Sequence, residues 1–230
     1  MKKTLRQLMY GERFMWEGEE HALKEHDLSG SASAGPCITR IHDKHDHCVS
    51  YSHRDYSEIE VELVPRCISL WAPWAFALMY LGKDVENRSL ASTVRGITGR
   101  IWIHASKWPM NGVPLKPKTK AFNDFFGQYQ AAADIYMSQG PSFEVLPAEY
   151  EFEHIERTRG AIIGSMEITH YQEPDNPPDS IWYAQGQRAV MMRDPKPLSV
   201  PVPCGGALGF WRPDAETNSI LERVRERDAA

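Results

Sequence analysis

Seven residues, Gly82-Lys83-Asp84-Val85-Glu86-Asn87-Arg88, connect a helix-like run to a strand-like run in the middle of the chain. The run before them, 71–81, is apolar at helical spacing and has Pro73 near its start, where proline is tolerated because the first turn leaves its N–H groups unpaired. Gly82 suits the position after a helix, which often takes the left-handed backbone that glycine adopts without strain. The stretch therefore predicts a helix that ends near Gly82 and a strand that runs through Val85.

The charges of this stretch allow two interpretations. Glu86 and Arg88 are two residues apart, so a strand would point both to the same side, whereas Lys83 would join them only through a bend after Gly82. Such a pair could recognise a ligand, with Glu86 accepting from an exocyclic amine and Arg88 binding a phosphate or a base edge. It could equally be an ion pair within the sheet, worth about 1 kcal/mol at most.

The role of Lys83 also allows more than one interpretation. In a pocket it could hold a phosphate, polarise a carbonyl or act as a base. It could also simply complement the negative end of the preceding helix dipole.

The rest of the main domain predicts more strands than helices. Residues 100–105 alternate, with Ile101 and Ile103 on one side and Trp102 and His104 on the other, which is typical of a strand. Aromatic residues recur with helical spacing in 121–137 and predict an amphipathic helix. Strands are also predicted at 161–169, 182–192 and 207–211, loops at 111–120, 172–180 and 194–206, and a charged, helix-prone end from Ala215.

The first 66 residues predict a small antiparallel β module. Phe14 lies in a short alternating run before a glycine turn. The runs 38–41 and 48–51 could pair with each other, and 58–63 alternates glutamates with apolar residues, as a half-buried strand does. Pro65 ends that alternation, so we place the start of the main domain at residue 67.

Composition limits the function. The 230 residues are 42% hydrophobic and 25% charged, as in globular proteins, and a formal net charge of −5 argues against nonspecific duplex binding through many phosphates. No apolar run approaches the length of a membrane span, and no signal core follows the N-terminal lysines, so we expect neither membrane insertion nor secretion. The four cysteines are widely spaced and do not form the pattern of a disulfide framework, so we expect free thiols in a reducing compartment. We therefore expect a cytoplasmic protein.

Several motifs occur in an order that resembles the ASCH domain family of the PUA-like superfamily. The block 68–75 precedes the segment with glycine, lysine, glutamate and arginine at 82–88, and Arg100-Ile101-Trp102-Ile103-His104-Ala105-Ser106 follows it. Gly160–Gly164 and Pro203–Arg212 are similar to the later strands of longer members. The resemblance covers about 67–213, with an insertion at about 108–150, and leaves the N-terminal module outside.

The resemblance implies a small β-barrel with flanking helices and a cleft between the first helix and the sheet, lined by Lys83, Glu86 and Arg88. It also implies RNA or other nucleic-acid ligands. Some relatives are hydrolases that act on RNA or remove acyl groups from modified cytosine nucleosides. In those amidohydrolases a threonine stands where this chain has Glu86, and this departure weakens a direct transfer of their threonine-nucleophile mechanism.

Four further side chains are candidates for the site or for ordinary packing. Trp74 could stack on a base, as Trp71 could, although a tryptophan at a helix start more often belongs to the core. His104 and Ser106 end a strand near the expected cleft, where they could contact a ligand or satisfy nearby backbone. Glu167 interrupts an apolar strand and would be a second acid or base if it faced the cleft, but an exposed strand face explains it more simply.

The histidines His42, His45, His47 and His53 cluster around Cys48. His45 and His47 would share a strand face and could bind zinc, but interleaved charges and the absence of a second ligand pair favour a polar hairpin. We therefore expect no metal and no other cofactor.

The resulting hypothesis is an α+β, mostly β protein with three parts: the module 1–66, a PUA-like domain 67–215 and a charged tail 216–230. It would bind single-stranded RNA or DNA, or a modified nucleobase, through Lys83, Glu86, Arg88, Trp74, His104 and Ser106. One alternative is a hydrolase, a ribonuclease or an amidohydrolase on modified cytidine, with Lys83 and Glu86 catalytic. A second alternative is a protein-interaction adaptor that works through the module 1–66. The oligomeric state is left open.

Overall fold

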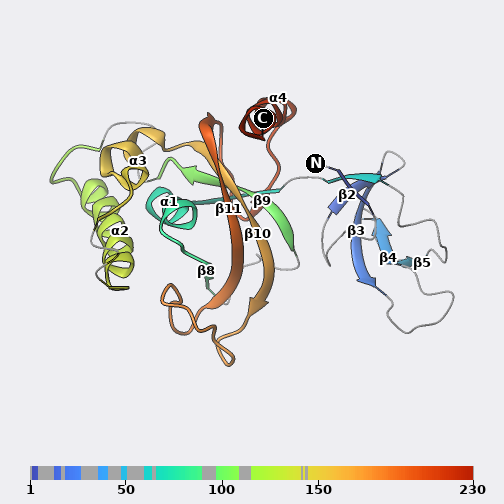
Figure 1. Ribbon diagram of the computed structural model, residues 1–230, viewed down its shortest axis with the longest axis horizontal. Coiled ribbons are helices and arrows are strands. Elements are labelled where there is room, and N and C mark those ends of the chain that lie inside the picture. Colours follow the sequence, from blue (N-terminus) through green and yellow to red (C-terminus); the bar gives the residue numbers. More distant parts are fainter. Residues whose placement is uncertain are drawn as a thin grey trace. The chain divides into compact units, whose positions relative to one another are not determined.

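The chain forms two compact units (Figure 1). The first is Met1–Pro65 with Arg95–Gly99, and the second is Arg66–Val94 with Arg100–Ala230. Among the residues that the structure describes, no helix has the length and apolar character needed to cross a membrane. The structure is a computed structural model that describes residues 2–4, 13–16, 19–26, 36–40, 48–50, 60–63, 66–89, 97–108, 115–140, 142 and 145–229.

The first unit contains a sheet of short strands: β1 Lys2–Thr4, β2 Arg13–Trp16, β3 Glu19–His26, β4 Pro36–Arg40, β5 Cys48–Ser50 and β6 Glu60–Leu63. Their order is β1-β6-β2-β3-β4-β5, and neighbouring strands are antiparallel throughout. The two runs expected to pair do so, with Ile38 opposite Val49, and the alternating run at 58–63 supplies β6. Phe14 in β2 is fully buried.

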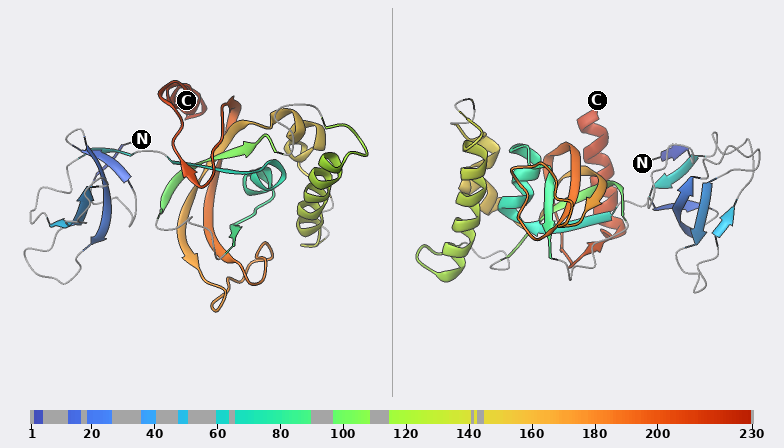
Figure 2. Two further views of the ribbon diagram at one scale, coloured as in Figure 1. Left: turned by 180° about the vertical axis from the view of Figure 1, so that it is seen from behind. Right: turned by 90° about the horizontal axis from the view of Figure 1, so that it is seen from below.

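The second unit is built on a larger sheet: β7 Arg66–Trp71, β8 Val85–Arg88, β9 Gly99–Ser106, β10 Ala161–Gln172, β11 Arg188–Pro203 and β12 Phe210–Trp211. Its order is β12-β7-β9-β10-β11-β8, and β10 and β11 curl it into a half-barrel (Figures 1 and 2). β7 and β9 are parallel, with Ile68 opposite Ile103, because the chain between them crosses over through a helix. The sheet confirms the α+β, mostly β prediction.

Four α-helices and one short 3-10 helix are described with this sheet: α1 Ala72–Tyr80, α2 Lys120–Met137, η4 Ala148–Tyr150, α3 Phe152–Thr158 and α4 Ala215–Ala229. α1 packs against the sheet on one side and against α2, η4 and α3 on the other. The aromatic stripe of α2 contacts Phe152, around which the rings of Phe122, Phe126 and Tyr129 pack. α2 thus confirms the helix predicted at 121–137, and Thr119 caps it by accepting from the Phe122 N–H at 3.2 Å.

The charged C-terminal segment is a packed helix. Leu221 in α4 is fully buried in a cluster with Cys67, Trp102, Ile162 and Val202. α4 therefore covers the side of the sheet toward which Trp102 points.

The prediction of a loop at 194–206 was wrong, because β11 continues to Pro203 and begins only at Arg188. β8 pairs with β11 only over Arg188–Met191, so the later part of β11 has a partner strand on one side, β10. Prolines are tolerated in such a strand because they remove N–H groups that no neighbour needs. The proline content therefore indicated an edge rather than a loop.

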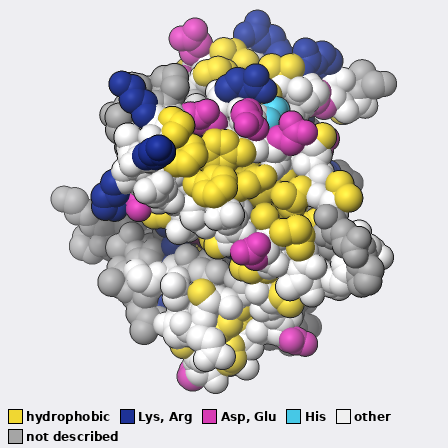
Figure 3. All heavy atoms as spheres, turned by 90° about the vertical axis from the view of Figure 1, so that its left-hand side faces the viewer, with side chains coloured by type: hydrophobic (Ala, Val, Ile, Leu, Met, Phe, Trp, Pro, Cys, Tyr) yellow, Lys and Arg dark blue, Asp and Glu magenta, His cyan; other side chains and the backbone are white. Residues whose placement is uncertain are grey.

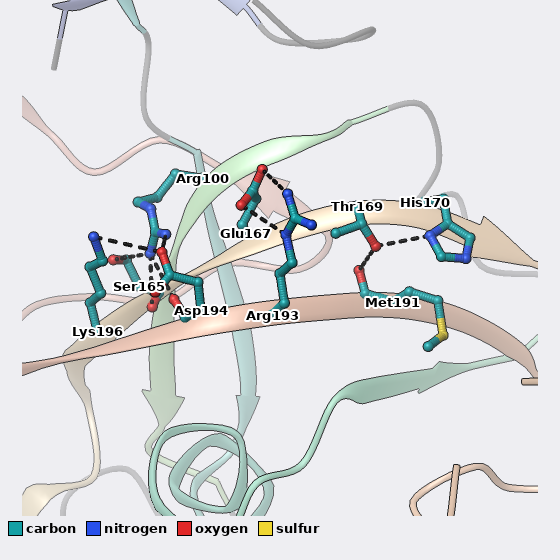
Figure 4. Close-up of polar contacts among 9 residues, drawn as sticks. All are labelled: Arg100, Ser165, Glu167, Thr169, His170, Met191, Arg193, Asp194 and Lys196. Carbon is teal, nitrogen blue, oxygen red and sulfur yellow. Dashed lines mark hydrogen bonds and ion pairs between the residues drawn. The ribbon is translucent and has the colours of Figure 1, made fainter. Parts of the chain in front are cut away.

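A bulge in β11 is held by side chains of three strands (Figure 4). Asp194 takes a left-handed backbone with φ 52°, where the register shifts between Ser165 and Glu167 of β10. Arg100 reaches from β9 to the carboxylate of Asp194 and to its carbonyl oxygen, the latter at 3.0 Å. Glu167 is bound by both Arg193 Nε and Nη2, at 3.1 and 3.3 Å.

The face of the molecule near α2 and α3 is chemically mixed. Hydrophobic side chains form a broad area in its middle, and acidic side chains beside a histidine border that area (Figure 3).

Candidate functional site

The end of α1 positions the segment 82–88. The N–H groups of Leu81 and Lys83 both donate to the carbonyl of Ala77, at 3.0 and 3.2 Å, and Gly82 between them has φ +70°. This left-handed residue turns the chain sharply between helix and strand. It supplies the bend that Lys83 needs to reach the side occupied by Glu86 and Arg88.

Four of the predicted side chains are brought together there. The Lys83 ammonium donates to the Val85 carbonyl and lies 3.9 Å from a carboxylate oxygen of Glu86. Glu86 also lies 3.2 Å from Arg88 Nε. The ring of Trp74 in α1 is 5.7 Å from Lys83 Nζ, within the range of a cation–π contact.

Lys83 is only 3% exposed, and this burial decides its electrostatics. Loss of hydration lowers the pKa of Lys83 below its usual 10.5, and the charge of Arg88 acts in the same direction. The carboxylates of Glu86 and Asp84 oppose this lowering of the pKa. The result is a cation held in a small buried space with a lowered pKa.

Arg88 presents hydrogen-bond donors that no residue in the described part of the chain accepts. Its Nη2 is buried, and no group in the described part of the chain accepts a hydrogen bond from it. A buried guanidinium nitrogen left in this way costs free energy unless water or a ligand accepts from it. Arg88 therefore has spare donors next to the carboxylate of Glu86.

Arg188 is a member of this cluster that the sequence analysis missed. It lies directly opposite Arg88 in the β8–β11 pairing, and residues opposite each other in an antiparallel pair present neighbouring side chains. Arg188 is 2% exposed, and its Nε donates to Glu173 at 2.6 Å. The sequence signal was an arginine at the start of a strand, but only the strand register shows that it neighbours Arg88.

The opposite side of β8 fixes a long connection. Asn87 donates to the Trp182 carbonyl at 2.7 Å and accepts from the Ala184 N–H at 2.9 Å, while Ser180 donates to Asp84 at 2.6 Å. Alternation along β8 thus places Asn87 and its structural hydrogen bonds on the side opposite Glu86 and Arg88, while Asp84, which precedes β8, fastens the same connection through Ser180.

His104 and Ser106 are not brought to this cluster. His104 lies 3.1 Å from Ser69 Oγ and 3.4 Å from the Cys204 carbonyl, with its ring against Trp211. Ser106 has a buried hydroxyl with no hydrogen-bond partner among the described residues. No hydrogen bond, ion pair or ring contact in the described part of the chain joins either residue to Lys83, Glu86 or Arg88.

The two tryptophans and Glu167 each make contacts of their own. Trp74 donates to Gln128 of α2 at 2.7 Å, which fixes its indole, whereas Trp71 is 40% exposed and stacks on Trp108 with centroids 3.9 Å apart. Glu167 is paired with Arg193 (Figure 4), and no hydrogen bond or ion pair among the described residues joins it to Lys83.

No metal centre is evident among the described residues, where no group of three or more histidine, cysteine or acidic side chains could hold an ion. The predicted histidine cluster, His42, His45, His47 and His53, lies outside the described residues.

Comparison with known proteins adds no assignment. No protein-family model matches this chain, and no curated protein matches it either. The chemistry of the cluster must therefore be argued from its own geometry: buried cations, one carboxylate acceptor and a fixed aromatic ring, which together suit a planar, hydrogen-bonding, anionic ligand.

Proposed function

We propose that the second unit is a PUA-like domain of the ASCH type that binds nucleotides. The ligand would be one or two nucleotides of single-stranded RNA or DNA, or a modified nucleobase. The binding groups would be Lys83, Glu86, Arg88 and Trp74, with Arg188 beside them.

The observation that carries this proposal is the pairing of Arg88 with Glu86. The two side chains are 3.2 Å apart, and Arg88 Nη2 has no acceptor in the described part of the chain. A carboxylate and a guanidinium side by side can accept from an exocyclic amine and donate to a ring nitrogen, carbonyl or phosphate oxygen. Arg188 and Lys83 add positive charge for a phosphate group.

A small ligand agrees with the overall charge. A protein with a formal net charge of −5 gains little from a long polyanion, whereas a local group of cations can still bind one or two phosphates. Binding should therefore depend only weakly on salt compared with that of a duplex-binding protein.

The test is titration of fluorescein-labelled ten-residue oligonucleotides of U, A and dT, together with N4-acetylcytidine followed by calorimetry. Arg88→Ala should weaken binding about tenfold or more, because a hydrogen bond to a charged group contributes about 1.5–3 kcal/mol. Lys83→Met should also weaken binding while it keeps the volume of the buried side chain.

Arg193→Ala is the matched control. Arg193 also pairs with a glutamate, at 3.1 Å, but its side chain is 64% exposed on another part of the sheet. The Arg193→Ala variant should bind every probe with the affinity of the wild type. The proposal would be contradicted if wild type, Arg88→Ala and Lys83→Met bound the probes with equal affinity while their circular dichroism spectra showed that all three are folded.

A second candidate, a hydrolase for RNA or acylated cytidine, is favoured by one observation. The lowered pKa of Lys83, caused by burial, increases the fraction of neutral amine that can accept a proton, and Glu86 lies 3.9 Å away. Incubating RNA and N4-acetylcytidine with the protein, with and without chelator, distinguishes the two. Product formation that is lost in Lys83→Met supports the hydrolase, and binding without product supports the nucleotide-binding function.

A further inference from the structure

A second site can be argued on another side of α1. A pocket of about 720 Å³ opens there, and its floor contains Phe76 of α1, Ile163 of β10 and Leu198 of β11. Pockets of about 300–1,000 Å³ with an apolar floor and a few polar groups are typical of small-molecule sites. None of its lining residues belongs to the segment 82–88.

The two sites lie on different sides of α1. Trp74, which contacts Lys83, and Phe76, which lines the pocket, are two residues apart in the helix. Two residues correspond to a rotation of about 200°, so their side chains point in nearly opposite directions. The pocket is therefore independent of the nucleotide site proposed above.

An irregular part of β11 forms one wall of the pocket. Ile162 pairs with Val202 and Gly164 pairs with Pro197, so β11 has three more residues than β10 between these two pairs. The extra segment is fastened to the end of α4: the Ser199 N–H donates to Asp228 at 2.9 Å, and Arg227 donates to Ser199 Oγ at 2.6 Å. The wall is thus held in place by the last turn of α4.

The polar groups around the pocket are acidic or aromatic. Glu149, Asp228, Tyr80 and His154 line it, and the lining residues that the structure describes include neither lysine nor arginine. Asp228 is already engaged by Ser199 and lies 3.9 Å from Arg227. Glu149, by contrast, has no donor or cation partner in the described part of the chain, which leaves its carboxylate available at the rim.

The rings give the pocket an aromatic side. The Phe76 and His154 rings meet edge to face with centroids 5.6 Å apart, and Tyr80 lies 5.8 Å from Phe76. Burial, together with the charge of Glu149, raises the pKa of Tyr80, so its hydroxyl stays protonated and can donate at neutral pH. An aromatic body would be covered by these rings while a cationic group reached Glu149.

We propose that this pocket binds an aromatic amine, with the ring over Phe76 and Ile163 and the ammonium paired with Glu149. A carboxylate ligand of the same shape would face two acidic side chains, and no lysine or arginine stands among the described lining residues. Charge therefore sets the specificity, and contact with the apolar lining adds to the affinity.

The test uses two probes of matched shape, tryptamine and indole-3-propionate, on the full chain. Binding is measured by calorimetry and located by the methyl resonances of Ile163 in the pocket and of Ile220, a residue of α4 outside the pocket lining. We expect saturable tryptamine binding that shifts Ile163 and leaves Ile220 unchanged, with indole-3-propionate at least fivefold weaker.

Substitutions at the rim complete the test. Glu149→Gln should weaken tryptamine about two- to fivefold, the range of an exposed ion pair, and Glu149→Lys should remove the preference for the amine. Glu153→Lys, an exposed charge change on α3 outside the lining, should leave the affinity unchanged. Equal affinity for both probes, a shift at Ile220 alone, or wild-type affinity in Glu149→Lys would overturn the proposal.

Discussion

Protonation of His104 should destabilise the fold, and this provides a direct test of the position of that residue. His104 is 1% exposed, between Ser69, Trp211 and the Cys204 carbonyl. Burial lowers the pKa of His104 from 6.5 to about 4, with the Cys204 carbonyl opposing the change and Lys107 adding to it. A neutral ring that donates from Nε2 and accepts the Ser69 hydroxyl at Nδ1 satisfies both partners.

The direction of the pH effect follows from the lowered pKa. Above pH 6.5 both folded and unfolded His104 are neutral, so the stability is complete. Between pH 6.5 and about 4 the unfolded chain binds a proton that the folded chain does not, so the free energy of unfolding falls. The full difference corresponds to about 3 kcal/mol, of which most is lost by pH 4.5.

The assay is urea denaturation of the wild type and two variants at pH 7.5 and pH 4.5. The loss of unfolding free energy over this range should be about 2–3 kcal/mol smaller in His104→Gln than in the wild type, because that variant has no proton to bind. His170→Gln, which removes an exposed histidine of β10, should lose as much as the wild type. A parallel loss in wild type and His104→Gln would refute the buried, neutral placement of His104.

Two glycines provide further tests of the backbone by urea denaturation. Gly82→Ala should cost about 1–2 kcal/mol, because φ is +70° and a methyl group there would meet no atom within 4 Å, so the cost is conformational alone. Gly127→Ala, in the open on α2, is its control and should stabilise by about 0.5–1 kcal/mol; the same sign for both would contradict the left-handed backbone at Gly82. Gly164→Ala should cost about 2 kcal/mol or more, because its methyl group would lie 2.7 Å from the Lys196 carbonyl oxygen and against Met79; wild-type stability would show that β10 and α1 are not packed so closely.

Local features of the site were predictable because local sequence causes them. Pro73 in the first turn, the apolar helix and the left-handed Gly82 all follow from preferences that act within a few residues. The same holds for the side shared by Glu86 and Arg88, which depends only on strand alternation. The proximity of Lys83 to Glu86 and Arg88, by contrast, depends on the bend at Gly82, which strand alternation does not predict.

Features that depend on strand pairing could not be predicted from the sequence. Arg188 becomes a neighbour of Arg88 only through the register of β11 against β8, which joins residues 100 positions apart in the chain. His104 was expected near the cleft because it ends a strand, but the direction in which it points depends on which helix covers that side. The long strand through Pro203 was missed for a related reason: proline signals a missing donor, and only the sheet order shows that no neighbour needs it.

The buried charged side chains of the cluster cost stability, which raises the question of why the protein retains them. The lowered pKa of Lys83 means that its electrostatic attraction to Glu86 and Asp84 does not fully compensate its loss of hydration. A side chain of similar size without charge would fill the same space at no such cost, so packing alone does not explain a lysine there. Arg88 adds a buried donor for which no described residue supplies an acceptor. Groups that cost stability in the free protein can recover it when a ligand supplies the missing charge and acceptors, and Lys83→Met separates these effects because it should keep or raise stability while it removes binding.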